Sequence, residues 1–121
     1  MAATKALTVM HDNATLTASA ANTVADAVDL ADGYGGLLHI KLTNGATGPT
    51  VAAQVQVEAS ADNSNFYNLG GALKGSTTNA AVSSWCMDIP AGVMYPRTTS
   101  GSNTGQNVTL RVELVEITAV S

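Results

Sequence analysis

Residues Gln106–Ala119 read QNVTLRVELVEITA and give the clearest structural signal in the chain. Hydrophobic residues occupy alternate positions along the first half of this stretch: Val108, Leu110, Val112 and Leu114. The positions between them carry polar or charged side chains: Thr109, Arg111 and Glu113. An alternation with a period of two residues predicts a β-strand with one face on a hydrophobic core and the other in solvent.

Four earlier segments repeat this alternation, and Phe66–Leu69 is predicted to be a short strand. The clear ones are Gly36–Thr43 and Thr50–Ser60, and the weaker ones are Val82–Ile89 and Val93–Thr98. The last of these contains Pro96, which cannot donate a backbone hydrogen bond and so indicates an edge strand or a bulge. The pattern is typical of an antiparallel sheet that packs one face on a core.

Clusters of turn-forming residues separate these segments. Asn44–Pro49 and Ala61–Asn65 are predicted to connect neighbouring antiparallel strands, so that two hairpins in succession form a meander. Lys74–Ala80 and Thr99–Gly105 are the most polar and glycine-rich loops, and we expect both to be exposed, mobile and available to a partner.

Ala18–Asp32 is ambiguous on its own pattern. A helix is suggested by the possible capping box from Thr23 to Asp26 and by Gly33 as a stop signal, whereas Val24, Val28 and Leu30 would share one face of a strand. Short β-patterned segments elsewhere favour the strand. We therefore predict an all-β fold, a single antiparallel β-sandwich or jelly-roll-like domain of about eight short strands. Residues 1–12 are expected to form an N-terminal arm or first edge strand, and residues 13–121 the sandwich domain.

Composition excludes several classes of function. The chain has 121 residues, enough for one domain, and charged residues make up only 12% of it, with a formal net charge of −4. Its five cations are scattered singly: Lys5, Lys41, Lys74, Arg97 and Arg111. Nucleic acids and acidic membrane surfaces require clustered cations, so neither is an expected partner. No apolar run approaches the ~18 residues that cross a bilayer.

Catalytic chemistry has few candidates. A nucleophilic site needs a base, and the two histidines, His11 and His39, show no spacing that suggests a metal site or a triad. We expect His39 to face solvent from the polar side of its strand. The single cysteine, Cys86, excludes an intrachain disulfide and is expected to be a buried or half-buried, inert thiol.

Ligand sites are equally sparse. Asp26, Asp29 and Asp32 precede Gly33 at a spacing that does not match a calcium loop, so a solvated acidic edge is expected. Trp85 is the only plausible platform for a sugar, and a core position is favoured for it. The sequence therefore predicts no catalytic residue, no metal site and no cofactor.

Six segments spread along the chain together resemble a known family. They are Ala14–Ser19, Ala27–Leu30, Leu38–Leu42, Val55–Leu69, Tyr95–Arg97 and Val108–Val115, and their most specific part is Glu58–Phe66, EASADNSNF. These segments resemble small β-sandwich virion proteins of tailed bacteriophages, most closely the capsid decoration, or cement, proteins. The resemblance implies that Ala27–Leu30 is a strand. One departure is Tyr95-Pro96-Arg97-Thr98, where such sequences commonly read Tyr-Val-Arg-Val.

The resemblance also implies a function. Such proteins are oligomers, typically trimers, that sit on the major capsid protein and have no catalytic residues. We therefore expect a non-enzymatic homo-oligomer on the capsid surface of a virion, made in the cytoplasm of a host bacterium. Candidate contacts with the capsid or with other subunits are Lys5, Leu7 and Val9 in the N-terminal segment. The alternatives are a phage tail or fibre module and a virion-displayed carbohydrate-binding module.

Overall fold

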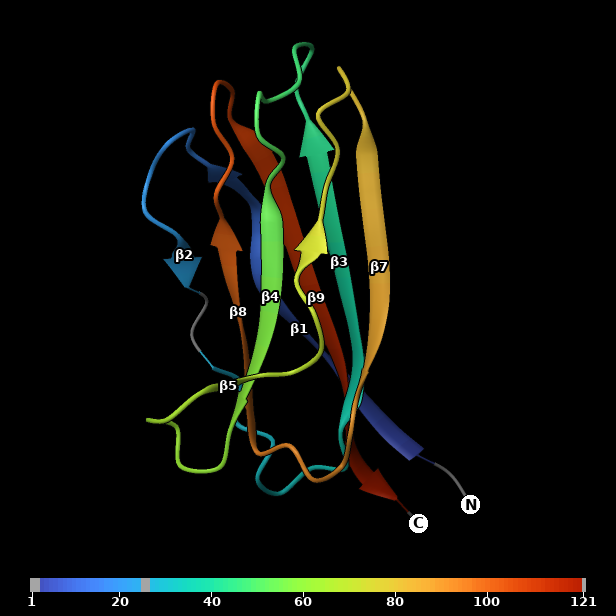
Figure 1. Ribbon diagram of the computed structural model, residues 1–121. Helices are drawn as coiled ribbons and strands as arrows, with labels where there is room; N and C mark the ends of the chain where they lie inside the picture. The colour runs from blue at the N-terminus through green and yellow to red at the C-terminus, as the bar shows by residue number, and fades with distance from the viewer. Residues whose placement is uncertain (1–2, 25–26, 121) are drawn as a thin grey trace.

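The computed structural model describes residues 3–24 and 27–120 and consists of two antiparallel β-sheets packed face to face (Figure 1). The four-stranded sheet has the order β1 (Ala3–Leu16), β9 (Val108–Val120), β3 (Gly36–Asn44) and β7 (Val82–Ile89). The five-stranded sheet has the order β2 (Thr23–Val24), β8 (Tyr95–Gly101), β4 (Gln54–Ser60) and β5 (Tyr67–Asn68), with β6 (Leu73–Lys74) also paired to β4. The predicted antiparallel β-sandwich is confirmed, and none of the described segments is a helix that could span a membrane.

The core lies between the sheets and is built from the residues that alternation placed on one face. Strands β3 and β9 contribute Leu38, Ile40, Leu42, Val108, Leu110, Val112 and Leu114, and β4 contributes Val55 and Val57. Each of these side chains is at most 1% exposed. Full burial of a Leu or Val side chain contributes roughly 1.5–3 kcal/mol, so these residues dominate the free energy of folding.

The connection from β3 to β4 differs from the prediction. Asn44–Pro49 was expected to join neighbouring strands of one sheet, but β3 and β4 belong to opposite sheets, so the predicted meander is wrong. Turn-forming residues show where the chain reverses direction, and both strands bury one face in either arrangement. The second predicted hairpin is confirmed, because Glu58 of β4 pairs with Asn68 of β5.

Strand β8 buries a mostly polar face. Thr98 and Ser100 are at most 1% exposed, and Pro96 between the sheets is also buried. The predicted exposed loop Thr99–Gly105 is therefore wrong in its first half, which is strand, and at Asn103, which is 1% exposed. Asn103 Nδ2 donates to the carbonyl oxygens of Leu16 (3.0 Å) and Gln106 (2.9 Å), which explains how an amide can replace a hydrophobic side chain there.

The ambiguous segment contains the short strand β2 and then runs extended beside β8. The N–H of Val28 donates to the carbonyl of Pro96 (3.0 Å), and that of Leu30 donates to the carbonyl of Met94 (2.7 Å). Leu30 is buried in the core at 2% exposure. No helix forms in its described residues, while Asp26 of the possible capping box lies outside the described residues.

Two glycines allow the chain to enter β3. Gly35 has φ of +77°, and a Cβ atom there would lie 2.2 Å from the carbonyl oxygen of Ile89. A Cβ atom at Gly36 would lie 2.2 Å from the carbonyl oxygen of Val115. These glycines serve a tight backbone approach.

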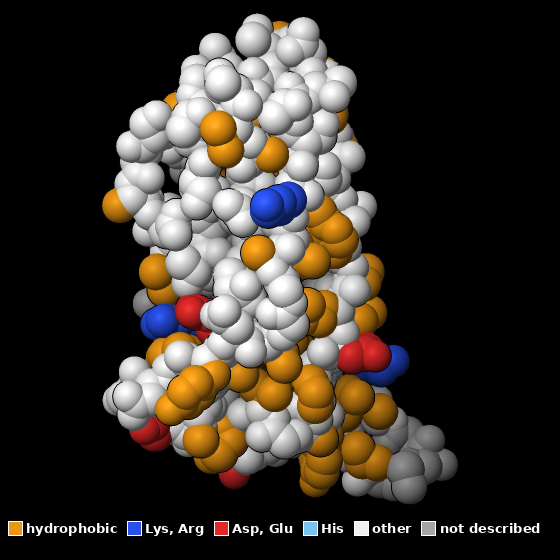
Figure 2. All heavy atoms as spheres, in the orientation of Figure 1, with side chains coloured by type: hydrophobic (Ala, Val, Ile, Leu, Met, Phe, Trp, Pro, Cys, Tyr) orange, Lys and Arg blue, Asp and Glu red, His pale blue; other side chains and the backbone are white. Residues whose placement is uncertain are grey.

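The two ends of the sandwich differ in chemistry. One end holds the start of β1 and the end of β9, and the opposite end holds four stretches without a charged or aromatic residue: 17–22, 45–53, 75–81 and 102–107. Figure 2 shows this contrast, since charged and large hydrophobic side chains gather toward the end that carries the termini. The candidate sites for specific contacts therefore lie on the half of the molecule near the termini.

A candidate interaction surface on the four-stranded sheet

The outer face of the four-stranded sheet carries exposed hydrophobic side chains. Leu7 of β1 pairs with Val115 of β9, which pairs with Leu37 of β3, so the three form one row across the sheet. Val9 lies in the next row, opposite Glu113. Leu7 is 59% exposed and Val9 is 41% exposed, while Leu37 and Val115 are half-buried. We call Leu7, Val9, Leu37 and Val115 the apolar patch.

Irregularities in β1 set the direction of these side chains. The pairing with β9 shifts between Val9 and His11, so that Met10 is an additional residue, and Met10 packs against the core. His11 lies opposite the buried Val112, and its Nε2 atom is buried without a hydrogen-bond partner. Burial lowers the pKa of His11 below its usual value of 6.5.

An ion-pair network borders the apolar patch. Arg111 donates from Nε to Glu113 and from Nη1 to Asp12 of β1. The hydrogen bonds to Glu113 and then Asp12 raise the pKa of Arg111. Exposed pairs of this kind contribute little to stability, but they fix the charges at the border of a hydrophobic surface.

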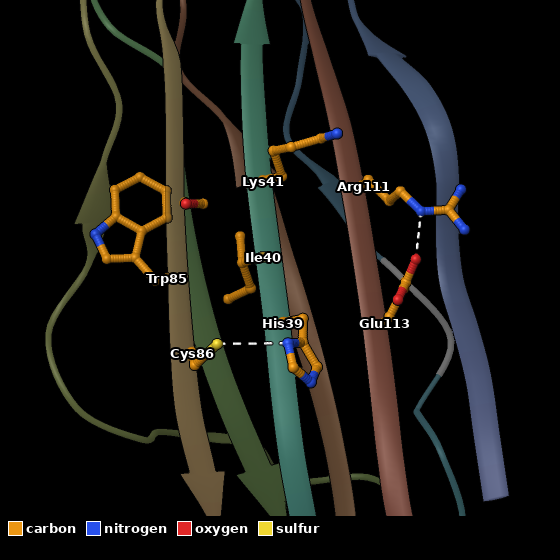
Figure 3. Close-up of a pocket in the computed structure, with 8 residues that line it drawn as sticks. His39, Ile40, Lys41, Trp85, Cys86, Arg111 and Glu113 are labelled. Carbon is orange, nitrogen blue, oxygen red and sulfur yellow. Dashed lines mark hydrogen bonds and ion pairs between the residues drawn. The ribbon is translucent and has the colours of Figure 1, made fainter.

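A shallow hollow of about 390 Å³ lies beside this network (Figure 3). It is lined by His39, Ile40, Lys41, Ser84, Trp85, Cys86, Arg111 and Glu113. Cys86 is exposed, which corrects the prediction of a buried or half-buried thiol, and its Sγ atom lies 3.4 Å from Nδ1 of His39. Cys86 alternates with Trp85 and Met87, which pack against the core, so its side chain lies on the outer face of the sheet and is open to solvent.

Other sequence candidates do not form sites. Trp85 is half-buried and packs against the core, as favoured. Asp29 and Asp32 line a second hollow of about 260 Å³ with Glu116, and Asp26 lies outside the described residues. Among residues 3–24 and 27–120, no group of three His, Cys, Asp or Glu side chains is placed to hold a metal ion.

The most specific motif of the resemblance stabilises a turn. The carboxylate of Asp62 accepts hydrogen bonds from the backbone N–H groups of Asn65 (2.9 Å) and Ser64 (3.0 Å) and from the hydroxyl of Ser60 (2.9 Å). These bonds hold the pKa of Asp62 well below its usual range. The motif is therefore explained by local structure.

The two ends of this motif are joined through a neighbouring strand. Arg97 of β8 pairs with Glu58 (2.9 Å) and lies over the Phe66 ring, 3.6 Å from its centroid. Burial raises the pKa of Glu58, but hydrogen bonds from Thr99 and Arg97 and the charge of Arg97 outweigh this effect and lower it.

The structure brings the predicted contact residues together with others that the sequence did not reveal. Lys5, Leu7 and Val9 are all exposed on β1, with Lys5 opposite Ile117. The predicted boundary between residues 12 and 13 lies inside this strand. Leu37 and Val115 were missed, although both are hydrophobic residues at positions where the alternation calls for polar ones, and this was the available signal.

Comparisons with known proteins concern the fold. No protein-family model matches the chain, and no curated protein sequence matches it. Solved structures of a family 16 carbohydrate-binding module (10% identity, TM-score 0.48, 81% of this chain and 70% of that chain) and of a family 29 carbohydrate-binding module from Piromyces equi (12%, 0.47, 92% and 90%) are similar. The SPBc2 prophage-derived protein YomS has 17% identity and a TM-score of 0.55 over 95% of this chain and 96% of that chain. The chain thus shares a β-sandwich fold with this prophage-derived protein over nearly the whole length of both.

Proposed function

We propose that the protein is a capsid decoration, or cement, protein of a tailed bacteriophage. It binds the outer surface of the shell formed by the major capsid protein and stabilises that shell without enzymatic activity. It is made in the cytoplasm of the host bacterium and acts on the virion surface as a homo-oligomer. The proposal includes no cofactor, nucleic acid or membrane.

Two independent likenesses support a virion role. The chain resembles phage decoration proteins in sequence along most of its length, and its fold is similar to that of a prophage-derived protein. The sequence likeness supports a structural protein of a phage virion, and decoration proteins are its nearest match within that class. The second likeness supports only the β-sandwich fold.

The observation that carries the proposal is the apolar patch. A chain with so few exposed charges still presents Leu7 and Val9 to solvent at 59% and 41% exposure, next to Leu37 and Val115. Full burial of such a side chain contributes roughly 1.5–3 kcal/mol, and because about half of each remains exposed, a partner gains about 1 kcal/mol from covering it. Charges at the border, such as the Arg111 pairs, leave the centre of this surface uncharged, as in protein interfaces.

A surface of this size fits a protein that acts in many copies. Each contact supplies a modest free energy, and linked copies on one shell bind more tightly than single ones. Because the protein binds only the assembled shell, its binding shifts the equilibrium away from dissociated subunits. Shell stability is therefore the expected readout.

The binding test uses empty shells assembled from the major capsid protein of the phage that encodes this chain. The double variant Leu7→Glu, Val9→Glu places two charges in the apolar patch and is expected to lose co-sedimentation with the shells. Thr15→Glu is the matched control, because Thr15 is an exposed residue on the same strand and the same face, near the uncharged end. Equal binding by all three proteins would contradict the proposal.

The functional test is heat resistance of the particle. Virions that carry the protein should release their DNA at a higher temperature than virions stripped of it, and adding the protein back should restore the difference. Virions stripped of the protein that resist heat as well as intact ones would contradict the cement role. Copy number separates the alternative, since hundreds of copies support the shell and a few to tens indicate a tail or fibre.

A further inference from the structure

Strand β7 has one unpaired edge. It is the last strand of the four-stranded sheet and, within the described residues, pairs only with β3. This pairing runs without a register shift from Gly36 opposite Ile89 to Thr43 opposite Val82. The other side of β7 therefore presents a straight row of backbone groups that have no strand partner.

The register identifies which residues point to this edge. The N–H of Asn44 donates to the carbonyl of Ala81 (2.9 Å), so these two residues form a hydrogen-bonded pair of the antiparallel ladder. Hydrogen-bonded and non-hydrogen-bonded pairs alternate in such a ladder. The backbone groups that face away from β3 hence belong to Val82, Ser84, Cys86 and Asp88.

This edge lacks the features that normally prevent strand addition. Natural edge strands are protected by Lys, Pro, bulges or shortness. Strand β7 is eight residues long, contains neither Lys nor Pro, has no bulge in its pairing with β3, and carries a single charge at Asp88. A regular, nearly uncharged edge is a template for another strand.

We propose that β7 pairs with β7 of a second copy of this chain, antiparallel about a two-fold axis perpendicular to the sheet. Residues that lie opposite each other in a sheet point to the same face, so opposite residues of the two β7 strands must be an even number of positions apart in the sequence. A two-fold axis then passes between one residue and the same residue of the second copy. Placing Trp85 opposite the partner's Trp85 pairs Val82 with the partner's Asp88 and Ser84 with the partner's Cys86. All four residues with free backbone groups then find a partner.

Charge favours the same register. The two Asp88 carboxylates lie at opposite ends of the new ladder, each opposite a valine, so no like charges meet across the contact. A register centred on Asp88 would place the two carboxylates opposite each other and leave most of the ladder unpaired. With a second copy as the occupant, all four residues with free backbone groups are paired and no like charges meet.

This contact is independent of the proposed capsid function. The apolar patch is centred on β1 at the opposite edge of the same sheet, so β7 can pair while the patch binds a shell. The contact gives a two-fold dimer, in place of the trimer that the family resemblance implies. Shell binding and dimerisation can fail separately, and a measurement of mass or of cross-linking detects dimerisation alone.

The first experiment measures mass by sedimentation over a wide range of concentrations. The native chain should be a dimer, and Ser84→Pro should raise the dimer dissociation constant by about tenfold or more, because it removes an N–H that faces the open edge and none that bonds β3. Ser84→Lys should do the same by charge and needs no change of backbone. Thr109→Lys is the control: it adds the same charge on the same face of the central strand β9 and should remain a dimer.

The second experiment uses the only cysteine of the chain. In the proposed register the two Cys86 residues lie diagonally across the two-fold axis, about 7–8 Å apart. A short bis-maleimide should link two chains of the native protein, and Cys86→Ser should abolish the link. A native protein that is monomeric at every concentration overturns the proposal, and so does a dimer that is neither linked through Cys86 nor weakened by Ser84→Lys.

Discussion

The two edge strands of the four-stranded sheet differ in the regularity of their pairing and in their charge. Strand β1 is 14 residues long, shifts register three times against β9, and carries Lys5 and the ion-paired Asp12. Strand β7 is eight residues long and pairs with β3 without a shift. Bulges and charges make β1 a poor template for another strand. The same strand presents the hydrophobic side chains of Leu7 and Val9 on the outer face of the sheet. We infer that β1 offers a face to a shell, whereas β7 offers an edge to another copy.

The largest expected difference between β7 and β1 is in how much a side chain of each strand contributes to the free energy of unfolding. Trp85→Ala should lower the free energy of unfolding by about 3 kcal/mol, because Trp85 packs against the core from β7. Leu7→Ala on β1 should cost less than about 0.5 kcal/mol, since this side chain is mostly exposed. Urea unfolding of both variants measures the contrast. Similar losses at the two positions would show that Leu7 is a folding residue and that its exposure has no bearing on binding.

A smaller loss of stability is expected from a substitution at Asn13, in the irregular part of β1. Asn13 has φ of 50°, a left-handed conformation that β-branched residues adopt only at a cost. Asn13→Val should therefore lower the free energy of unfolding by about 1–2 kcal/mol, while Asn13→Gly should leave it nearly unchanged. Thermal unfolding compares the two variants. A stable Asn13→Val protein would mean that β1 can straighten, and its association should then be measured as for β7.

The smallest effect is the pH dependence contributed by β1. Burial lowers the pKa of His11, so the unfolded chain takes up a proton at this residue below about pH 6.5 while the folded chain resists it. Stability that is present above pH 6.5 should therefore decline as the pH falls below about 6.5.

His11→Leu should flatten this decline, and His39→Gln, which replaces the other histidine, should leave it in place. Denaturant unfolding at several pH values gives the comparison. The lowered pKa values of Glu58 and Asp62 act in a separate range, because their stabilisation is lost only as pH falls below their usual values of 4.5 and 3.8. A decline that begins just below pH 6.5 and persists in His11→Leu would contradict this assignment.

The alternation of hydrophobic and polar residues predicted the positions of strands better than it predicted which strands lie side by side. It identified β3, β7 and β9 nearly to the residue, because each turns every second side chain toward the core. It could not tell that β3 and β4 lie in different sheets, since the turn residues between them suit either path. It predicted β8 only in part, as Val93–Thr98 instead of Tyr95–Gly101, because the buried face of this strand carries Thr98 and Ser100 in place of hydrophobic residues.

The candidate surface was predictable only in part. Leu7 and Val9 were found because they alternate near the N-terminus, but the other half of the apolar patch depends on which strands β9 joins. The contact between Cys86 and His39 likewise depends on the register of β3 and β7. The open edge of β7 is a property of sheet order, which local patterns do not encode.

Co-sedimentation with shells of two variants, one for each edge strand, tests the division of roles between β1 and β7. We predict that Ser84→Lys, a monomer, still sediments with shells, though more weakly because avidity is reduced. We also predict that Leu7→Glu, Val9→Glu remains a dimer and stays in the supernatant. Loss of shell binding in Ser84→Lys with full binding by the double variant would contradict the assignment of the shell contact to β1.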